Sequence, residues 1–286
     1  MMKKNTATIG LEILTAILFL IFLVPFFIVL INSGKDSFSV TQYPMALPEN
    51  WGMIPRNMAT IWTSPNVQYS SSFVTSLVVT AASLVALVVL SSQAAWVLVR
   101  TKTRMSGFLF LLFVAAMVVP FQIVMFPLVT WFRAVFDVTG IKLLRTYLGM
   151  VLAYVGFGMS LSIFLYHGFI KGIPYELEEA ATIDGARKHA VFYLIISPIL
   201  KPIHATVLVL NGIWIWNDYL LPLLVLGKGN RIQTIPLAVA NFAGAFVKQW
   251  DLILTAILMA MIPIIVFFLA AQKSIVKGMI AGSVKG

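Results

Sequence analysis

Residues 147–170 read YLGMVLAYVGFGMSLSIFLYHGFI and contain no aspartate, glutamate, lysine or arginine. About 20 consecutive apolar residues in a helix span the hydrocarbon core of a bilayer. The whole chain is 60% hydrophobic and only 10% charged, whereas soluble domains carry about 25% charged residues. A soluble globule could not cover so much apolar surface with so few charges. The stretch therefore decides the fold class, which is an integral membrane protein made of helices.

Five more segments of this kind predict an all-α bundle with six transmembrane helices. The six predicted spans are Leu11–Ile31, Phe73–Val99, Phe108–Phe132, Tyr147–Ile170, Ile203–Leu226 and Leu252–Ala271. Lys3 and Lys4 precede the first span as in a signal peptide, but its apolar run is too long and no small-x-small cleavage site follows. We expect this first helix to be retained. Prolines that would kink the spans are Pro25, Pro120, Pro127, Pro222 and Pro263.

The basic residues predict the orientation of the chain. The net charge is +10, from 20 basic and 10 acidic residues. In a soluble chain this balance would point to nucleic acid, but here the basic residues lie in short segments between apolar runs. Such positive flanks orient membrane proteins, so we expect no nucleic-acid partner. With both termini in the cytoplasm, 12 lysines and arginines lie inside and 8 outside, and the short segment 100–104 is the strongest indication.

We divide the chain at the second span. Residues 1–72 would form an N-terminal transmembrane helix and an extracytoplasmic segment, and residues 73–286 the transmembrane core. The external stretch 32–72 holds four prolines and two tryptophans, which predicts an ordered, turn-rich or interfacial segment. The second long external stretch, 227–250, opens with the turn signal GKGN and continues into apolar residues that could re-enter the membrane edge or form a docking loop.

The inner segment 171–202 is too long and too patterned for a connector. It reads KGIPYELEEAATIDGARKHAVFYLIISPILKP. Pro174 suits a first helical turn, and the three glutamates that follow, at 176, 178 and 179, favour the positive end of a helix dipole. Gly185 is placed to adopt a left-handed backbone and end that helix. The segment predicts a cytoplasmic helical hairpin, with a second arm that carries Arg187 and Lys188.

The turn of this hairpin has features of a docking surface. Ala180 and Ala181 are small enough for another surface to approach closely, and Glu179 and Asp184 supply charge for an arginine or lysine on it. A solvated amphipathic hairpin explains the same residues equally well. The residues alone leave both interpretations open.

Residues 179–186, EAATIDGA, followed by Phe192, Ile195, Pro198 and Pro202, resemble the EAA signature of ABC importer permeases. The resemblance implies the type I importer permease fold, a bacterial-type plasma (inner) membrane, and a coupling helix docked in a groove of a cytoplasmic ATPase subunit. Ser197 departs from the leucine that the family usually has there. The residues to which the resemblance assigns ATPase coupling are Glu179, Ala180, Ala181, Asp184 and Gly185.

Three further features are similar to the carbohydrate branch of that family, and in particular to the second permease subunit of maltose-type importers. They are Arg100, the run WNDYLLPL at 216–223, and the C-terminal GMIAGSVKG at 278–286. The similarity covers about residues 73–286. It implies four kinds of partner: a similar permease, a dimer of ATP-binding cassette ATPases, an extracytoplasmic solute-binding protein, and membrane lipid.

The sequence argues against enzyme activity in this chain. It has no G-x-x-x-x-G-K-[ST] nucleotide-binding pattern, so ATP hydrolysis is expected in a separate subunit. His167, His189 and His204 lack metal-ligand spacing, no serine lies in G-x-S-x-G, and there is no cysteine. We therefore expect no catalytic residue, no metal and no cofactor.

Asp218 lies well inside the fifth predicted span, where an acid is costly unless it faces a cavity or a partner. Pro222, four residues later, removes the helical donor to its carbonyl. The opened helix could contact a sugar through Asn217 and Asp218, with the ring face stacked on Trp214 or Trp216. Alternatively, Asp218 tethers the broken helix and the tryptophans belong to the interfacial belt. The residues favour the tether.

The expected function is a transmembrane permease subunit of a binding-protein-dependent ABC importer for a sugar or oligosaccharide, working by alternating access. Pro120, Pro222 and Pro263 are candidate flexing points. The alternatives are the same importer class for a polyol or glycerol phosphate, or a self-contained secondary carrier. A carrier would show inverted repeats, and the sequence has no persuasive internal symmetry.

Overall fold

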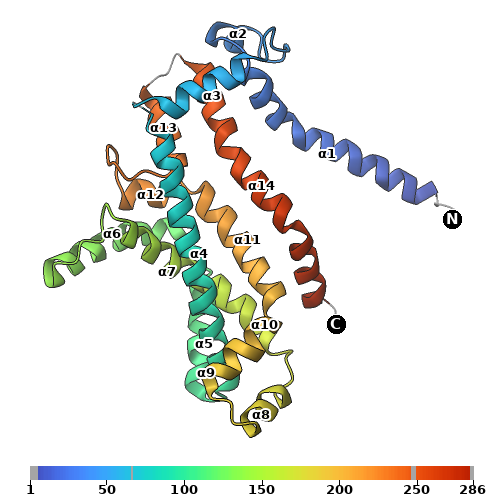
Figure 1. Ribbon diagram of the computed structural model, residues 1–286, viewed down its shortest axis with the longest axis vertical. Coiled ribbons are helices and arrows are strands. Elements are labelled where there is room, and N and C mark those ends of the chain that lie inside the picture. Colours follow the sequence, from blue (N-terminus) through green and yellow to red (C-terminus); the bar gives the residue numbers. More distant parts are fainter. Residues whose placement is uncertain (1–5, 66, 246–248, 284–286) are drawn as a thin grey trace. The chain divides into compact units, whose positions relative to one another are not determined.

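The computed structural model describes residues 6–65, 67–245 and 249–283, and these are helical with short connections (Figure 1). The helices are α1 (Thr6–Ser33), α2 (Ser37–Gln42), α3 (Met53–Thr63), α4 (Tyr69–Arg100), α5 (Arg104–Ala116), α6 (Phe121–Thr139), α7 (Tyr147–Ile170), α8 (Glu176–Ile183), α9 (Lys188–Ala190), η1 (Val191–Ile196, a π-helix), α10 (Ser197–Ile199), α11 (Lys201–Asn217), α12 (Leu220–Val225), α13 (Ile235–Ala245) and α14 (Trp250–Ser283). The basic residues Lys3, Lys4, Lys248 and Lys285, and the last three residues of the C-terminal motif, lie outside the described residues.

The chain forms two compact units. The first contains residues 1–70 and 238–263, and the second contains residues 71–237 and 264–286. The sequence-based division into 1–72 and 73–286 follows the order of the chain instead, and it stays a prediction.

In the part of the chain that the structure describes, five helices are long and apolar enough to cross a membrane: α1, α4, α6, α7 and α14. A sixth span results if Lys188–Ile199 and Lys201–Asn217, which meet at an angle of 75°, count as one. The expected all-helical membrane architecture is confirmed. Backbone groups in hydrocarbon need internal hydrogen bonds, and helices supply them within one segment.

Two predicted spans are wrong in their bounds. Ile203–Leu226 is not one continuous helix, because α11 ends at Asn217 and α12 begins at Leu220, and the candidate sixth span joins Lys201–Asn217 with Lys188–Ile199 instead.

The other span, Phe108–Phe132, is two helices, because α5 ends at Ala116 and α6 begins at Phe121. Pro120 is the extended N-cap residue of α6 and does not lie inside a helix. Proline has no N–H to donate and holds the preceding residue away from helical geometry, so the apolar run breaks there although its hydropathy is continuous.

The stretch after α1 in the first unit carries α2 and α3, and its place outside the membrane stays a prediction. Asp36 caps α2 by accepting from the N–H groups of Phe38 and Ser39, both at 3.0 Å. Lys35 is buried, and its ammonium donates to the Asn32 side chain at 2.9 Å and to the Tyr43 carbonyl at 2.8 Å. Hydrogen bonds made by Lys35 and Asp36 therefore hold the connection between α1 and α2.

Helix α7 is the central element of the second unit and lies in two buried clusters. The first core cluster includes Met150 and Tyr154, and the second includes Ile163 and Tyr166, all four fully buried. The hydroxyl of Thr146 caps the helix by accepting from the Gly149 N–H at 3.1 Å. A side chain at Gly149 would collide with the Leu143 carbonyl. The predicted bounds of this span, 147–170, are confirmed.

Candidate functional site: the helical hairpin and the broken span

The first arm of the predicted hairpin is α8. Glu176, Glu178 and Glu179 occupy its first turn, as expected from the helix dipole. At its end the N–H of Gly185 donates to Thr182 O at 3.0 Å, and the N–H of Ala186 donates to Ala181 O at 2.9 Å. These two bonds form a Schellman motif, which requires a left-handed residue. Gly185 has φ +85° and supplies it, so the predicted glycine stop is confirmed.

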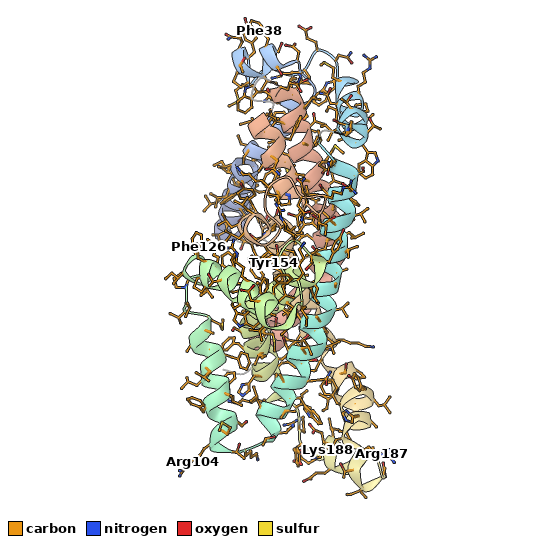
Figure 2. The ribbon with its side chains drawn as sticks, turned by 90° about the vertical axis from the view of Figure 1, so that its left-hand side faces the viewer. Phe38, Arg104, Phe126, Tyr154, Arg187 and Lys188 are labelled. Carbon is orange, nitrogen blue, oxygen red and sulfur yellow. The ribbon has the colours of Figure 1, made fainter. Side chains whose placement is uncertain are left out.

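The second arm runs from Lys188 to Ile199 and contains the π-helical stretch Val191–Ile196. It turns by 75° into α11, which Pro202 starts in its first turn. Figure 2 places Arg187 and Lys188 of the hairpin at the same end of the second unit as Arg104 of α5. Three of the basic residues that predicted a cytoplasmic side therefore lie at one end of this unit.

The residues assigned to coupling divide into two groups. Glu179, Ala180, Asp184 and Gly185 are exposed. Ala181 is buried, with 8% of its surface exposed, and belongs to the second core cluster. Its small side chain packs α8 against its own chain, and the assignment of Ala181 to ATPase coupling stays a prediction.

Large apolar side chains also lie exposed on the hairpin. Ile183 is 85% exposed, next to the glycine turn, and Leu177 and Tyr175 are 44% and 53% exposed. Apolar side chains lie beside acidic ones on the exposed turn at residues 179–185, which is called the elbow below. Such a surface is suited to another protein. Glu179 and Ile183, four residues apart on one side of α8, are both exposed.

Glu178, directly before the residues singled out for coupling, holds the hairpin to the bundle, and sequence reasoning missed it. Its side chain is only 7% exposed, and Oε1 lies 2.6 Å from Nε of Arg100. Oε2 accepts from the indole N–H of Trp96 at 3.0 Å. Arg100 also donates to the Ile173 carbonyl at 3.1 Å and stacks over the Tyr175 ring. Arg100 was noted in the sequence only as a family resemblance, and Glu178 only as a helix-dipole residue.

The second place with an unusual acid is the break between α11 and α12. Helix α11 ends at Asn217, and Asp218 is extended, so the predicted opening of this span is confirmed. Asp218 Oδ2 accepts from the hydroxyl of Tyr154 at 3.1 Å, and Oδ1 accepts from the Leu220 N–H at 3.0 Å. The carboxylate therefore bridges the two pieces of the span and ties them to α7.

The other predicted pathway residues point to different neighbours. Trp214 packs edge-on against Tyr154, with ring centroids 5.4 Å apart. Trp216 is buried and packs edge-on against Phe73 at 6.1 Å. Asn217 is exposed and donates to the Ile213 carbonyl at 2.8 Å. Trp214 and Asp218 thus meet at Tyr154, whereas Trp216 is part of the packing against α4.

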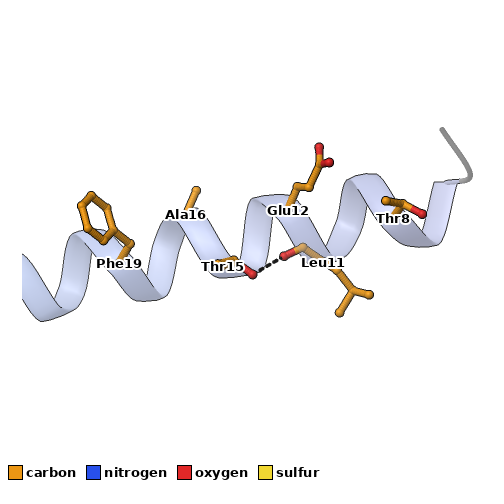
Figure 3. Close-up of a pocket in the computed structure, with 6 residues that line it drawn as sticks. All are labelled: Thr8, Leu11, Glu12, Thr15, Ala16 and Phe19. Carbon is orange, nitrogen blue, oxygen red and sulfur yellow. Dashed lines mark hydrogen bonds between the residues drawn. The ribbon is translucent and has the colours of Figure 1, made fainter. Parts of the chain in front are cut away.

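A hollow on α1 shows what does not form a binding site. Its six lining residues all belong to this one helix, and Thr15 donates to the Leu11 carbonyl at 2.8 Å (Figure 3). A hollow with one wall cannot enclose a solute. Within the described ranges, the acidic and histidine side chains also form no group of three that could hold a metal ion.

A helical membrane bundle with an acidic, alanine-containing hairpin at one end defines a class of protein, the permease component of a solute-transport system. Residues 88–281 match the family of binding-protein-dependent transport system inner membrane components, and the chain belongs to that family. It is thus a multi-pass inner-membrane permease, a component of a transporter.

The chain is similar along its full length to permeases of sugar importers. It is 38% identical over 286 residues, 100% of both chains, to the probable starch degradation products transport system permease protein AmyC of Thermoanaerobacterium thermosulfurigenes. It is 34% identical over 280 residues, 96% of each, to the melibiose/raffinose/stachyose import permease protein MelC of Bacillus subtilis. The resemblance to carbohydrate ABC importer permeases is confirmed.

A solved structure shares the fold. It is the crystal structure of a bacterial ABC transporter involved in the import of the acidic polysaccharide alginate, with a TM-score of 0.74 and 21% sequence identity. The match covers 96% of this chain and 99% of the other. The predicted type I importer permease fold is confirmed.

Proposed function

We propose that this chain carries a sugar or oligosaccharide into the cytoplasm as one of two permease subunits of an ATP-driven importer. Two relatives that match over nearly their whole length are named for starch degradation products and for melibiose, raffinose and stachyose. The solute class is proposed from the names of these relatives, because contacts along the transport path depend on the solute. The mechanism is proposed from the hairpin.

The exposed elbow of the hairpin carries the proposal of ATP coupling. Glu179, Asp184 and Ile183 are exposed, and the left-handed turn at Gly185 follows them. The sequence holds no phosphate-binding loop. A separate pair of ATPases would bind this elbow. A second permease would complete the pathway, and an extracytoplasmic binding protein would deliver the solute.

Alternating access then needs parts of the bundle that can re-pack. Three breaks supply them: residues 117–120 between α5 and α6, Asp218 between α11 and α12, and the bend at Leu200. Pro120 and Pro222 lie at or next to breaks, and Pro263 lies inside α14. ATP can bias the bundle only if the ATPase pair binds the two arrangements unequally. The termini would both lie in the cytoplasm, on the side of the hairpin.

At the break, we propose that Asp218 acts as a tether and that Trp214 alone borders the solute path. Both oxygens of Asp218 already accept hydrogen bonds from the chain, which leaves the carboxylate less free for a sugar hydroxyl. Trp214 is only half-buried and keeps part of its ring available for stacking. Trp216 would support the break through its packing against Phe73 of α4. Asn217 would support it through its hydrogen bond to the Ile213 carbonyl of α11.

The test is uptake of a labelled oligosaccharide into vesicles that contain the assembled complex and its binding protein. We expect uptake only with ATP inside. Uptake by the permease without the ATPases would show a self-contained carrier instead. Binding of only a polyol or glycerol phosphate to the binding protein would reassign the cargo, because that protein selects the solute.

The docking role is tested by Glu179→Lys, with Glu176→Lys as the matched control. Both glutamates are exposed in the same turn of α8. We expect Glu179→Lys to reduce the amount of ATPase that co-purifies with the permease, and Glu176→Lys to reduce it less. Equal recovery of the ATPase with both variants would remove the ion-pair interpretation.

A further inference from the structure

One face of α4 contacts both arms of the hairpin. Gln93, Trp96 and Arg100 are spaced by three and four residues, which places them in line on one side of a helix. They occupy the last two turns of α4 before it ends at Arg100. Two of its partners on the arms, Glu178 and Phe192, are buried, and the other two, Tyr175 and Tyr193, are about half exposed.

At the end of the stripe, Arg100 holds the first arm by its charge and by its shape. Its guanidinium contacts Glu178 Oε1, the Ile173 carbonyl and the face of Tyr175. The side chains of Arg100 and Glu178 are only 16% and 7% exposed. A charge pair so far removed from water resists separation, because each partner left alone would be buried without compensation.

In the middle of the stripe, Trp96 joins the two arms to each other. Its indole N–H donates to Glu178 of the first arm, and its ring packs against Phe192 of the second arm with centroids 5.3 Å apart. One turn earlier, the Gln93 amide donates to the hydroxyl of Tyr193 at 3.1 Å. The second arm therefore has a packing contact and a polar contact with the same helix face.

We propose that α4 and the hairpin move as one body, and that the force of the ATPase enters the bundle through α4. Trp96 and Arg100 are positioning residues in this step: they touch no solute and no nucleotide, and they keep the elbow aligned with the helix that it must move. This inference rests on the proposed function, and it assigns the transmission to particular side chains. Without the stripe, the elbow would still bind the ATPase, but the hairpin could move relative to α4 about the two ends where its chain joins α7 and α11.

The first experiment removes single contacts from the stripe and measures oligosaccharide uptake per ATP hydrolysed by the complex. Trp96→Phe deletes the indole N–H and keeps a ring against Phe192, and Glu178→Gln deletes the charge that Arg100 holds. We expect transport per ATP to fall about tenfold in Glu178→Gln and severalfold in Trp96→Phe, with the ATPase still co-purifying. Glu176→Gln, on the exposed side of the same turn, serves as control and should match the unmodified complex. Unchanged coupling in both stripe variants would overturn the proposal.

A second experiment tests the rigid connection directly and does not depend on the stability of those variants. The chain contains no cysteine, so Gln93→Cys with Tyr193→Cys introduces one defined pair between α4 and the second arm. We expect a short bifunctional reagent to link the pair both without nucleotide and with ATP bound, and the linked complex to keep at least half of its uptake. Linkage in only one state, or arrest of uptake by the link, would show that the arm moves against α4 and would overturn the proposal.

The unmodified complex separates this inference from the proposed function. If it fails to import oligosaccharide with ATP, the proposed function is wrong. If it imports the sugar and the linked complex does not, only the transmission through α4 is wrong.

Discussion

The carboxylates of Glu178 and Asp218 are both shielded from water in the second unit. They differ in the groups that compensate their charge. Glu178 lies against the guanidinium of Arg100 at 2.6 Å. Asp218 is half-buried and has only neutral donors, the hydroxyl of Tyr154 and the N–H of Leu220. The first acid joins a hairpin to a long helix, and the second joins two pieces of one broken span.

The difference indicates how firmly each junction is held. Removing one partner of a buried ion pair costs about 3–5 kcal/mol, whereas a hydrogen bond from a neutral donor to a charged group contributes about 1.5–3 kcal/mol. The contacts therefore favour a firmer junction between the hairpin and α4 than at the break beside Asp218. In the proposed transmission through α4, the firmer junction lies where the ATPase acts, and the weaker one lies at the break beside the solute path.

The largest effect is expected from Arg100→Ala, because it leaves the Glu178 carboxylate buried without its partner. We expect a loss of about 3–5 kcal/mol in the stability of the docked hairpin, read as faster proteolysis of residues 171–202 and a lower melting temperature of the complex. Arg104→Ala, an exposed arginine four residues later, is the control. Equal sensitivity of the two variants would mean that the ion pair does not hold the hairpin.

A large effect on coupling is expected from Gly185→Pro. Proline fixes φ near −65°, against the +85° found here, and it removes the N–H that bonds to Thr182 O. We expect transport to fall at least tenfold relative to ATP hydrolysis while the complex still reaches the membrane. Gly185→Asn is the matched control, because asparagine tolerates the left-handed region. Unchanged uptake with proline would contradict a role of this turn in coupling.

A smaller effect is expected from Asp218→Asn, since the amide oxygen can still accept one of the two hydrogen bonds. We expect a loss of about 1.5–3 kcal/mol, measured as a drop in melting temperature, with unchanged half-saturation for the sugar. Tyr154→Phe removes the same contact from the other side and should match it. A changed apparent affinity at full stability would instead place Asp218 on the solute path.

The smallest effect belongs to a third carboxylate, Asp36, which is exposed in the first unit. The N–H and hydroxyl groups of Ser39 hold the pKa of Asp36 below its ordinary value. A lowered pKa in the folded state stabilises α2 at pH values above the unfolded pKa, about 3.9, and this stabilisation is lost as the pH falls through the folded pKa. We expect hydrogen-exchange protection at Phe38 and Ser39 to fall only in acid, and Asp36→Asn to flatten that dependence. Full protection in acid would contradict the cap.

The hairpin was the most predictable part of the site. Its first helix, its glycine turn and its second arm follow from local signals, namely the glutamates of the first turn, Gly185 and the prolines that flank the segment. The break at Asp218 was predictable in the same way, from Pro222 four residues later. The break after Ala116 was not predicted, because the hydropathy of the run is continuous and only Pro120 marks it.

Neighbouring glutamates of α8 show where prediction from the sequence ended. Glu178 and Glu179 are adjacent and chemically the same, but consecutive residues of a helix point about 100° apart. One is buried against Arg100 and the other is exposed. Resemblance drew attention to the exposed one, and only the packing of α8 on α4 identified its neighbour.

The amino-acid order by itself determined the helical membrane fold and the positions of the turns, because hydropathy, proline and glycine act through residues close together in the chain. The tertiary structure decided which acid is paired and which is free to meet another protein. Arg100 and Glu178 lie 78 positions apart. No local signal reports such a contact, since it exists only when the hairpin packs on α4.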